Sequence, residues 1–579
     1  MTISSGALGS VSIALCGSGG AGVMTAANML LDAAAQVGYY ALFGRSSGPQ
    51  IRGGEAAALL RLSPRPITSV DDTYDILLAI DWQNVQRFAA ELPLNADSMI
   101  ITDPAAGEVP EVIAASGARI VPLPMKELCA DIAGGRPNMI ALGAVAALIG
   151  LPVEPLTEVL GKSLKKKRAD AYDASVAAVK KGAEAAAVLG QAKRLDVPAD
   201  AAARRWDITG NEAAGLGAVR GGVRFCAAYP ITPATEILEW MTGALAKVGG
   251  VFVQAEDELA SINMCVGASY GGSPAITATS GPGLSLMIEA LGMAVASETP
   301  VVVVDVQRGG PSTGIPTKSE QSDLNIALYG MHGDAPHLVV APQSIGDCLF
   351  TTQWAIHLAE ALQTACIVLS DQSLGQSRAI IDAPADLAFV GKRLAAASPA
   401  EDQQYRRYAL TANGVSPMAI PGTPGCQYTA DGLEHAVSGT PSSQESDHSA
   451  QLDKRLRKLT GHDYGSHWAT IEGDGPIAVL TWGSCTGAAR EAIGRARADG
   501  IEVRLIAPRL LSPTRPELLA KALEGVSKVL VVEQSHLGQF HRYLRSEYEL
   551  PGTVELLNHA GPLPIRPGAI HKRLLAMGA

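Results

Sequence analysis

Five short and almost uninterrupted runs of apolar residues lie in the middle of the chain, and helix-like segments separate them. The runs occupy residues 251–254, 275–278, 301–306, 338–340 and 365–369. A strand that is apolar on both faces has to be covered on both faces, which is typical of parallel sheets between two layers of helices. The pattern therefore predicts a doubly wound α/β domain, which we assign to residues 209–394.

Shorter patterns of the same kind precede and follow this domain. A first α/β unit, assigned to residues 1–191, is expected from strands at 11–15, 39–43, 76–80, 99–101 and 119–121 and a helix at 139–149. A polar, alanine-rich segment at 192–208 is expected to be a linker. A last α/β unit, assigned to residues 471–579, is expected from strands at 477–481, 502–506 and 529–532 and a helix at 487–499.

Residues 395–470 show no regular period and are rich in Gly, Ser, Thr and Pro. So long an irregular stretch in a compact protein suggests an extended arm that lies on a partner or on another domain. The chain as a whole has 61 Gly and only 4% aromatic residues. Small residues let helices lie close on parallel strands, so this composition also favours several α/β layers.

Charge and cysteine content exclude several classes of protein. The 46 Lys and Arg against 57 Asp and Glu give a formal net charge of −11, which argues against a general nucleic-acid surface. No two of the eight cysteines come within ten residues of each other, so we expect neither a zinc site nor an iron–sulfur cluster on this chain. No transmembrane stretch or signal peptide is evident, and we expect a soluble, cytoplasmic protein.

The first unit begins with a strand, a glycine turn at 17–22 (GSGGAG) and a helix, an arrangement that cradles phosphate groups. A dinucleotide site also needs an acidic residue at the end of the second strand, but this strand runs into GRSSGPQIRGGE at 44–55. The glycines could instead serve close packing of strand and helix. The loop at 44–55 carries Arg45 and Arg52 and suits carboxylate or phosphate groups, unless it is an ordinary surface excursion.

The sequence Tyr-Pro-Ile-Thr-Pro at 229–233 follows an apolar strand expected at 223–228. Its two prolines bracket Thr232 and fix this hydroxyl at the carboxyl end of a strand, where open α/β sheets bind their ligands. The segments TSGPG at 279–283 and RGGPSTG at 308–314 also follow strands. We expect all three loops to face one pocket.

Three acidic residues, Glu256, Asp257 and Glu258, begin a helix directly after the strand at 251–254. Carboxylates in a first turn complement the helix dipole, which is one interpretation of this run. The other is that one of them faces the pocket and hydrogen-bonds a ring nitrogen of a cofactor. The residue types alone leave both interpretations open.

Several long motifs resemble one known family. The stretches RGGVRFCAAYPITPATEILEWM at 220–241 and VQAEDELASINMCVGASYGGSPAITATSGPGLSLMIEALGMAVASETPVVVVDVQRGGPSTGIPTKSEQSDL at 253–324 are similar to the α subunit of 2-oxoacid:ferredoxin oxidoreductases, in particular of the 2-oxoglutarate type. The segments GSGGAGVMTAANMLLDAA and GRSSGPQIRGGEA look like the γ subunit of the family, fused ahead of α. GVSPMAIPGTPG and DKRLRKLTGH look like its connecting arm, so that the resemblance covers nearly the whole chain.

The resemblance implies a thiamine diphosphate enzyme divided between two chains. This chain would contribute a γ-like domain, a pyrimidine-binding-type domain and a domain like the C-terminal domain of transketolase. The only G-D-G, at 473–475, precedes an expected strand, and Asn558 is the only asparagine after it. The family pattern for the Mg²⁺ and pyrophosphate site is therefore not met here, and that site, like the 4Fe-4S cluster, is expected on a separate β chain.

The implied reaction converts 2-oxoglutarate, coenzyme A and oxidised ferredoxin to succinyl-CoA, CO₂ and reduced ferredoxin, reversibly, as in a tricarboxylic acid cycle. The implied assembly is an (αβ)₂ heterotetramer that passes electrons to ferredoxin. Two alternatives remain: the same chemistry on pyruvate or a branched or aryl 2-oxoacid, and a non-catalytic flavodoxin-like scaffold that docks an electron carrier.

The resemblance also implies roles for individual residues. Glu258, rather than Glu256, would bond the pyrimidine ring and activate the cofactor. Thr232 would hydrogen-bond near the substrate carbonyl or carboxylate, and Arg308 would bind the carboxylate bidentately. Further cofactor contacts are expected from Tyr229, Pro230, Ser280 and Gly281. Contacts to substrate or coenzyme A are expected from Arg45, Ser46, Arg52, Ser312, Thr313 and Lys318.

Overall fold

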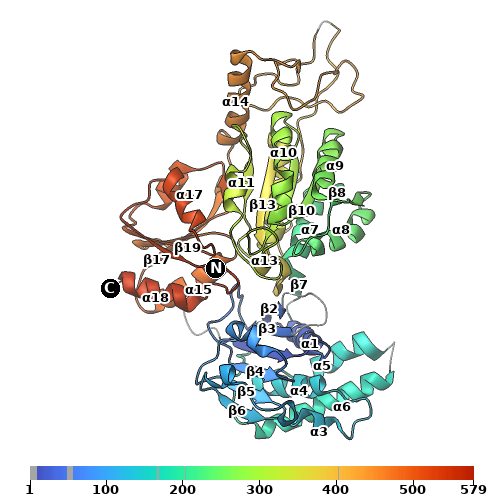
Figure 1. The fold of residues 1–579 in the computed structure, drawn as a ribbon, viewed down its shortest axis with the longest axis vertical. Coiled ribbons are helices and arrows are strands. Elements are labelled where there is room, and N and C mark those ends of the chain that lie inside the picture. The colour runs from blue at the N-terminus through green and yellow to red at the C-terminus, as the bar shows by residue number, and fades with distance from the viewer. Residues whose placement is uncertain (1–8, 48–55, 166–168, 203, 402, 579) are drawn as a thin grey trace.

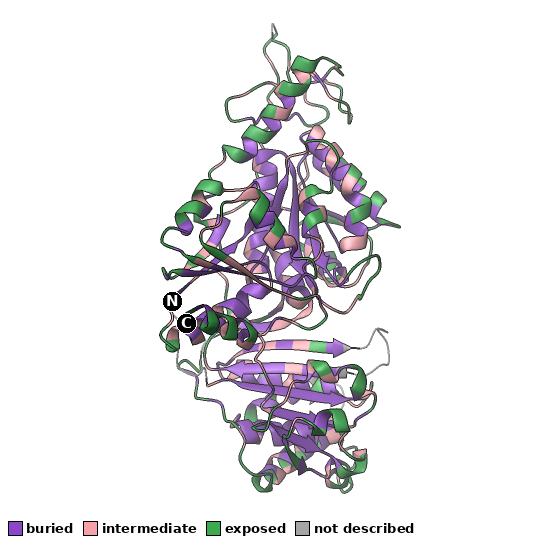
Figure 2. Cartoon of the chain, turned by 60° about the vertical axis from the view of Figure 1, so that its left-hand side comes forward, coloured by how far each residue is buried: buried purple, intermediate pink, exposed green. Residues whose placement is uncertain are grey.

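The computed structural model describes residues 9–47, 56–165, 169–202, 204–401 and 403–578. Three sheets make up the molecule, with the N-terminal unit at one end of its long axis and the segment around residues 400–460 at the other (Figure 1). Buried residues concentrate in the sheets and on the helix faces that cover them (Figure 2). None of the helices in the described ranges is long and apolar enough to cross a membrane.

The first sheet has eight strands in the order β6-β5-β4-β1-β3-β2-β14-β7. Strands β1, β4, β5 and β6 run parallel, whereas β3 and β14 run antiparallel to both of their neighbours. No local pattern indicated β7 or β14, because their partners lie far away in the sequence. The strands are β1 (Val11–Gly17), β2 (Tyr40–Ser47), β3 (Ala56–Ser63), β4 (Ile76–Ala79), β5 (Met99–Thr102), β6 (Arg119–Pro122), β7 (Arg205–Thr209) and β14 (Arg378–Asp382).

The two helices that contain Gly143 and Gly182 cross closely in this unit, with a glycine of each at the contact. A Cβ atom on Gly143 would lie 1.9 Å from the Val179 carbonyl oxygen, and one on Gly182 would lie 2.1 Å from that of Ile140. Only glycine permits so close an approach of two helix backbones. The helices are α1 (Val23–Gln36), α2 (Glu111–Ala114), α3 (Met125–Cys129), α4 (Pro137–Ile149), α5 (Val153–Leu160) and α6 (Ala169–Ala185).

The second sheet confirms the predicted parallel α/β domain. Its seven strands have the order β18-β12-β13-β11-β10-β8-β9, and all neighbours are parallel except β18 against β12. The strand order reverses at β8, because the chain passes to β9 on one side and returns to β10 on the other. The strands are β8 (Phe225–Ala228), β9 (Val251–Gln254), β10 (Ala275–Thr279), β11 (Val301–Gln307), β12 (Leu338–Val340), β13 (Ala365–Asp371) and β18 (Leu510–Ser512).

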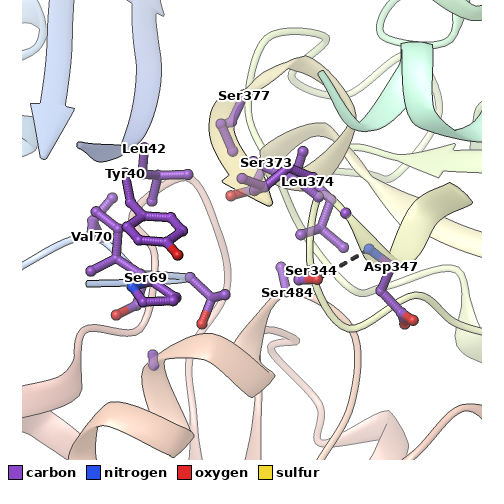
Figure 3. A pocket seen from close by; sticks show the side chains of 18 of the residues that line it. Tyr40, Leu42, Ser69, Val70, Ser344, Asp347, Ser373, Leu374, Ser377 and Ser484 are labelled. Atoms are coloured by element: carbon purple, nitrogen blue, oxygen red, sulfur yellow. Dashed lines mark hydrogen bonds between the residues drawn. The ribbon is translucent and has the colours of Figure 1, made fainter. Parts of the chain in front are cut away.

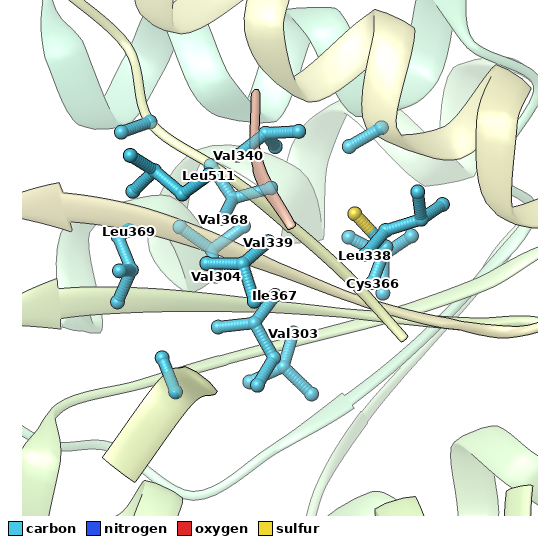
Figure 4. Packing of buried hydrophobic residues seen from close by; sticks show 14 of the residues in the cluster. Val303, Val304, Leu338, Val339, Val340, Cys366, Ile367, Val368, Leu369 and Leu511 are labelled. Atoms are coloured by element: carbon cyan, nitrogen blue, oxygen red, sulfur yellow. The ribbon is translucent and has the colours of Figure 1, made fainter. Parts of the chain in front are cut away.

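The core of this domain lies between the sheet and its helices. Val303, Val339 and Ile367 on three neighbouring strands are fully buried, and Leu511 of β18 packs into the same cluster (Figure 4). The C-terminal part of the chain therefore completes the core of the central domain. The helices here are α7 (Gly210–Arg220), α8 (Thr235–Lys247), α9 (Glu258–Tyr270), α10 (Gly281–Ala296), α11 (Leu324–Tyr329), α12 (Asp347–Leu362) and α13 (Gln372–Gln376).

We had expected the stretch at 395–470 to be irregular throughout. It contains one long helix, α14 (Glu445–Thr460). Lys454 and Lys458 lie on the buried face of this helix, with Nζ atoms 2.6 Å and 3.2 Å from the two carboxylate oxygens of Glu298. The inward face is thus cationic rather than apolar, and a search for apolar periodicity misses such a helix. These ion pairs fasten α14 to the central domain.

The third sheet has five strands in the order β15-β17-β16-β19-β20. The helix α15 (Cys485–Ala498), which follows the strand at 477–481 of this sheet, contacts the first unit directly: the Arg61 and Glu491 side chains pair at 2.6 Å, and a Cβ on Gly487 would lie 2.0 Å from the Thr68 carbonyl oxygen. The strands are β15 (Ala469–Glu472), β16 (Ile477–Thr481), β17 (Val503–Pro508), β19 (Lys528–Glu533) and β20 (Thr553–Asn558). The helices are α15 (Cys485–Ala498), α16 (Pro516–Ala522), α17 (Gln539–Glu547) and α18 (Pro567–Gly578).

Candidate active site

The loops that follow β8, β10 and β11 lie side by side at the carboxyl edge of the central sheet, because these three strands are adjacent and parallel. This edge includes the point where the strand order reverses, which is where doubly wound sheets bind ligands. The structure therefore brings together the three polar loops that the sequence analysis singled out.

Glu258 is the one member of the acidic run that points inward. Glu256 and Asp257 are exposed, and the Asp257 side chain caps α9 by accepting a hydrogen bond of 2.7 Å from the Ala260 amide. Glu258 is only 7% exposed, and its carboxylate has no hydrogen bond or ion pair within the described ranges. Helix capping thus explains Asp257 but not Glu258.

Glycine at position 283 makes room for this carboxylate. A Cβ atom there would lie 2.8 Å from Glu258 Oε1 and 2.0 Å from Thr279 Oγ1. The neighbouring Ser280 is fully buried, and its hydroxyl has no partner among the described residues. Gly281 begins α10 beside it. The Glu258 carboxylate at the start of α9 and the Ser280 hydroxyl at the start of α10 thus have no partner among the described residues, which leaves donor and acceptor capacity for a bound molecule.

Arg308 contacts the backbone of Thr232 rather than its hydroxyl. Arg308 Nη1 donates to the Thr232 carbonyl oxygen at 2.5 Å, and Asn211 Nδ2 donates to the Pro233 carbonyl oxygen at 2.9 Å. Thr232 is half-buried. Arg308 is 6% exposed, and its Nε is buried without a partner in the described part of the chain. An acceptor for this guanidinium is therefore missing.

The sequence analysis missed two aspartates, Asp305 and Asp323, whose charges act on Arg308. Asp305 is opposite Thr279 in the pairing of β10 with β11, and Asp323 directly precedes α11. Burial and the neighbouring Asp323 carboxyl hold the pKa of Asp305 well above its usual range. Burial also raises the pKa of Asp323, to about 6, and lowers that of Arg308. A charged residue inside the apolar run at 301–307 was the available signal for Asp305.

The first unit contacts two of the site loops through ion pairs. Arg45 Nη2 lies 2.6 Å from Glu236 Oε1 on α8, directly after the loop of Thr232. Lys318 pairs with Glu91 and donates to Ser46 Oγ at 3.2 Å. Arg45, Ser46 and Lys318 thus lie where the first unit meets the site, with both cations already paired.

The remaining expected contacts lie at the rim. Tyr229 is 40% exposed, and Pro230, Ser312 and Thr313 are exposed. The loop of Ser312 and Thr313 is closed at its base, where the Gly309 amide donates to the Lys318 carbonyl oxygen at 3.0 Å. Arg52 lies outside the described residues.

Two cavities lie away from Glu258. One, of about 480 Å³, opens where the three units meet, between Tyr40 and Ser69 on one side and Asp347, Ser373 and Ser484 on the other (Figure 3). The second, of about 1300 Å³, is lined by the glycine turn at 18–22 and by Lys126 and Arg136. At this turn the amide and hydroxyl of Ser18 both donate to the Asp81 carboxylate.

Comparison with protein families defines the class of this fold and site. A family described as "Pyruvate flavodoxin/ferredoxin oxidoreductase, thiamine diP-bdg" matches residues 216–454. Residues 12–185 match "Pyruvate ferredoxin/flavodoxin oxidoreductase", and residues 476–559 match "Pyruvate:ferredoxin oxidoreductase core domain II". The central sheet, which lies within the first of these matches apart from β18, is therefore that of a thiamine diphosphate-binding domain of this class of oxidoreductase.

Known proteins match over most of the chain. The α subunit of a Sulfolobus 2-oxoacid:ferredoxin oxidoreductase is 31% identical over 90% of this chain and 90% of its own length. The Methanothermobacter marburgensis 2-oxoglutarate synthase subunit KorA is 37% identical over 64% of this chain and 98% of its own. The structure of Magnetococcus marinus 2-oxoglutarate:ferredoxin oxidoreductase superposes with a TM-score of 0.91 and 35% identity, over 98% and 100% of the two chains.

The chain belongs to the 2-oxoacid:ferredoxin oxidoreductase family, as the resemblance of its motifs had indicated. It is therefore part of an oxidoreductase, and the relatives that match it along its length are α subunits of enzymes made of several subunits.

Proposed function

We propose that this chain is the α subunit, with a fused γ-like unit, of a 2-oxoglutarate:ferredoxin oxidoreductase that forms succinyl-CoA, CO₂ and reduced ferredoxin, reversibly. The observation that carries the proposal is the match along nearly the entire chain to the Magnetococcus marinus enzyme, which is described with 2-oxoglutarate, coenzyme A and succinyl-CoA bound. The proposed domains are 1–191, 209–394 and 471–579, with a linker at 192–208 and an arm at 395–470.

The residues at the strand ends fit the aminopyrimidine half of thiamine diphosphate. Glu258 offers a buried carboxylate and Ser280 a buried hydroxyl, each without a partner in the described part of the chain, and the missing side chain at Gly283 admits the Glu258 carboxylate. In this assignment Glu258 hydrogen-bonds the pyrimidine ring and holds a proton there. Ser280, Gly281, Tyr229 and Pro230 line the ring's place. The cofactor, when bound, supplies the carbon nucleophile and the electron sink for decarboxylation of a 2-oxoacid.

Arg308 is the proposed ligand of the substrate's 1-carboxylate. Its Nε is buried and has no partner among the described residues, and its Nη1 donates to the Thr232 carbonyl oxygen, so the guanidinium is oriented before the substrate arrives. Thr232 then places its hydroxyl beside the substrate carbonyl or carboxylate. The backbone anchors at Thr232 and Pro233 limit how far this hydroxyl can move.

The distal carboxylate and coenzyme A are assigned to the side of the first unit. Arg45 and Lys318 are cations at this junction, and each would exchange a protein carboxylate for one of the ligand. Ser46, Ser312 and Thr313 supply hydroxyl groups, and Arg52 is proposed as a second basic contact.

A separate β chain is proposed to hold Mg²⁺, the pyrophosphate and the 4Fe-4S cluster, in a cytoplasmic (αβ)₂ assembly that reduces ferredoxin. The eight cysteines of this chain support that assignment, because all of them are buried free thiols. Fe–S clusters need several thiolates converging on one point.

The test is reconstitution with the β chain and a panel of 2-oxoacids. The chain alone should be colourless and inactive, and the complex should be brown and should reduce a low-potential acceptor with 2-oxoglutarate and coenzyme A. Since all three matching families are described as pyruvate oxidoreductases, pyruvate is the second candidate. A higher kcat/KM for pyruvate, a branched or an aryl 2-oxoacid would overturn the substrate assignment, and a brown preparation of this chain alone would overturn the division of cofactors.

A further inference from the structure

At the carboxyl edge of the third sheet, where an open α/β sheet ordinarily binds its ligand, lies a segment of the chain's own central domain. Strands β16 and β19 are adjacent and parallel, so the residues that follow them meet at this edge. These residues hold Gln321, which is 0% exposed. Gln321 belongs to the segment at 319–323, which comes after the loop of Ser312 and Thr313 in the sequence. The C-terminal unit thus binds part of the site's own chain.

Gln321 contacts the C-terminal unit through its backbone and its side chain. The Gln321 amide donates to the Gln534 carbonyl oxygen at 2.8 Å, and the Gln534 amide donates to Gln321 Oε1 at 2.8 Å. Gln321 Nε2 donates to the Trp482 carbonyl oxygen at 2.9 Å. A buried glutamine needs partners for both ends of its amide, and here the C-terminal unit supplies them.

Two further glutamine side chains hold the residues on either side of Gln321. Gln534 Nε2 donates to the Ser319 carbonyl oxygen at 3.1 Å. Gln539 Nε2 donates to the Ser322 carbonyl oxygen at 2.8 Å. We call the contacts of Gln321, Gln534 and Gln539 the glutamine clamp. Its hydrogen bonds fix the backbone of the segment at three successive points.

Two glycines of the C-terminal unit let this segment come close. A Cβ atom on Gly483, whose φ is +59°, would lie 2.5 Å from Gln321 Nε2. A Cβ atom on Gly561 would lie 2.3 Å from the Ser319 carbonyl oxygen. A larger residue at either position has to push the segment away, so the fit depends on the backbone of both units.

The clamped segment directly follows a loop that is closed on itself. The Gly309 amide donates to the Lys318 carbonyl oxygen at 3.0 Å, and the Ile315 amide donates to the Gly309 carbonyl oxygen at 2.8 Å. Residues 310–315 are exposed, whereas the segment at 319–321 is buried. Because its base is closed and its end is clamped, the loop has little freedom to move against the site.

The loop at 309–318 contacts all three units. It begins directly after Arg308 in the central domain, and Lys318 Nζ donates to Ser46 Oγ of the first unit at 3.2 Å. The C-terminal unit holds the residues after it. Coenzyme A is far larger than a 2-oxoacid, and only its thiol has to reach the acyl group. The exposed loop at the rim therefore suits coenzyme A, whereas the buried Arg308 suits the carboxylate of the 2-oxoacid.

We propose that the glutamine clamp positions the loop at 309–318 for coenzyme A, with Gln321 as its central positioning residue. The C-terminal unit thereby takes part in acyl transfer without touching either reactant. This inference rests on the proposed function, because the loop residues are there contacts of substrate or coenzyme A.

The test is Gln321→Ala in the reconstituted αβ enzyme. CO₂ leaves before the acyl group passes to coenzyme A, so single-turnover release of labelled CO₂ without coenzyme A reports on the 2-oxoacid site alone. We expect KM for coenzyme A to rise about tenfold or more, and single-turnover release to stay within about threefold of wild type. Damage to the whole fold would lower both.

Gln343→Ala is the matched control. Gln343 is 5% exposed and joins the same two units away from the loop: its Nε2 donates to the Ala507 carbonyl oxygen at 2.6 Å, and its Oε1 accepts from Thr470 Oγ1 at 2.6 Å. The control loses a similar set of buried hydrogen bonds and should leave KM for coenzyme A unchanged.

Trypsin provides a readout that does not depend on turnover. The bond after Lys318 leads into Ser319, which is 5% exposed, so the clamp should protect this bond from cleavage. Gln321→Ala should speed cleavage there by about threefold or more, with the fragments identified by mass, and Gln343→Ala should not. Should Gln321→Ala fail to fold, Gln539→Ala removes a half-buried part of the clamp and should show the same two effects at smaller size.

The outcomes are distinct. A KM for coenzyme A equal to wild type, an equal rise of KM for the 2-oxoacid, or unchanged cleavage after Lys318 would overturn the proposal. So would a KM for coenzyme A that rises as far in Gln343→Ala. A wild-type enzyme whose turnover does not need coenzyme A would instead overturn the proposed function, and the trypsin assay would still decide whether the clamp holds the loop.

Discussion

The carboxylate of Glu258 lies against Gly283, so closely that a methyl group on Gly283 would come within 2.8 Å of Glu258 Oε1. The two residues begin different helices, α9 and α10, on either side of β10. The Glu258 side chain and Thr279 Oγ1 occupy the space that a side chain at position 283 would need, so the missing side chain is what admits the carboxylate. A buried carboxylate without a partner among the described residues is arranged to meet a ligand. This relationship supports the assignment of Glu258 to the cofactor.

Glu258→Gln should abolish turnover and leave the fold intact. The amide fills the same volume but cannot stabilise a protonated ring nitrogen, so we expect kcat to fall by about 10²–10³ or more. Steady-state kinetics of the αβ enzyme measure this. Glu256→Gln is the matched control, since Glu256 is exposed, and it should retain activity. If the Glu256 variant is inactive and the Glu258 variant active, the assignment is off by two residues.

Gly283→Ala should displace the carboxylate that we assign to the cofactor's ring. The added methyl group has to displace Glu258 or Thr279, so we expect the Kd for thiamine diphosphate to rise by about tenfold or more. Gly292→Ala on the same helix is the control, because nothing lies within 4 Å of its added Cβ. It should bind the cofactor normally and be more stable by about 0.5–1 kcal/mol. Equal cofactor affinity in both variants would show that Gly283 does not border the ring.

Arg45→Ala should change substrate choice. If Arg45 binds the distal carboxylate, its loss should lower kcat/KM for 2-oxoglutarate more than for 2-oxobutyrate, by about 1.5–3 kcal/mol in the ratio. Glu236→Gln removes the carboxylate partner of Arg45 and leaves the positive charge of Arg45 in place, so it should leave the ratio unchanged. An equal loss on both substrates would make Arg45 a structural or coenzyme A contact, and no loss would direct the search to Lys318.

The buried Glu298 should stabilise the fold at neutral pH and lose this effect at acid pH. The lysines of α14 hold the pKa of Glu298 at about 2, against 4.5 as its ordinary value, although burial alone would raise it. Because the pKa is lower in the folded state, ionised Glu298 contributes about 3 kcal/mol to the free energy of unfolding above about pH 4.5. This contribution is lost as the pH falls toward 2. Urea unfolding between pH 2 and 6 measures it.

The matched variant for this prediction is Glu298→Gln. It leaves Lys454 and Lys458 buried without their counter-charge and should lower the free energy of unfolding by about 3–5 kcal/mol at neutral pH. It should also lack the part of the acid dependence that belongs to Glu298. Wild-type acid dependence in the variant would show that other carboxylates are responsible.

The parallel core of the central domain was predictable because each of its strands is apolar on both faces. The strands expected at 251–254 and 338–340 match β9 and β12 residue for residue, and the others differ by one or two residues at an end. Strands β3, β7, β14, β15, β18 and β20 were missed. For β7, β14 and β18 the reason is that short strands whose partners lie far away in the sequence carry no local signal. Helix α14 was missed because buried cations, not apolar residues, form its inward face.

From the sequence, the candidate site could be predicted only to the extent that it is built from loops that follow strands. The carboxyl ends of β8, β10 and β11 had to meet, and so Thr232, Ser280 and Arg308 could be grouped from sequence. The Arg308 contact to the Thr232 carbonyl oxygen and the burial of Asp305 depend on tertiary packing that no local pattern encodes.

The most direct test of the central claim is the release of labelled CO₂ from 2-oxoglutarate labelled at its 1-carboxylate, by the αβ enzyme with coenzyme A and ferredoxin. We predict one CO₂ and one succinyl-CoA for every two electrons delivered to ferredoxin, and no release above background from an enzyme carrying Glu258→Gln. Release of label by the Glu258→Gln enzyme at the wild-type rate, or no release from 2-oxoglutarate by the wild-type enzyme, would contradict it.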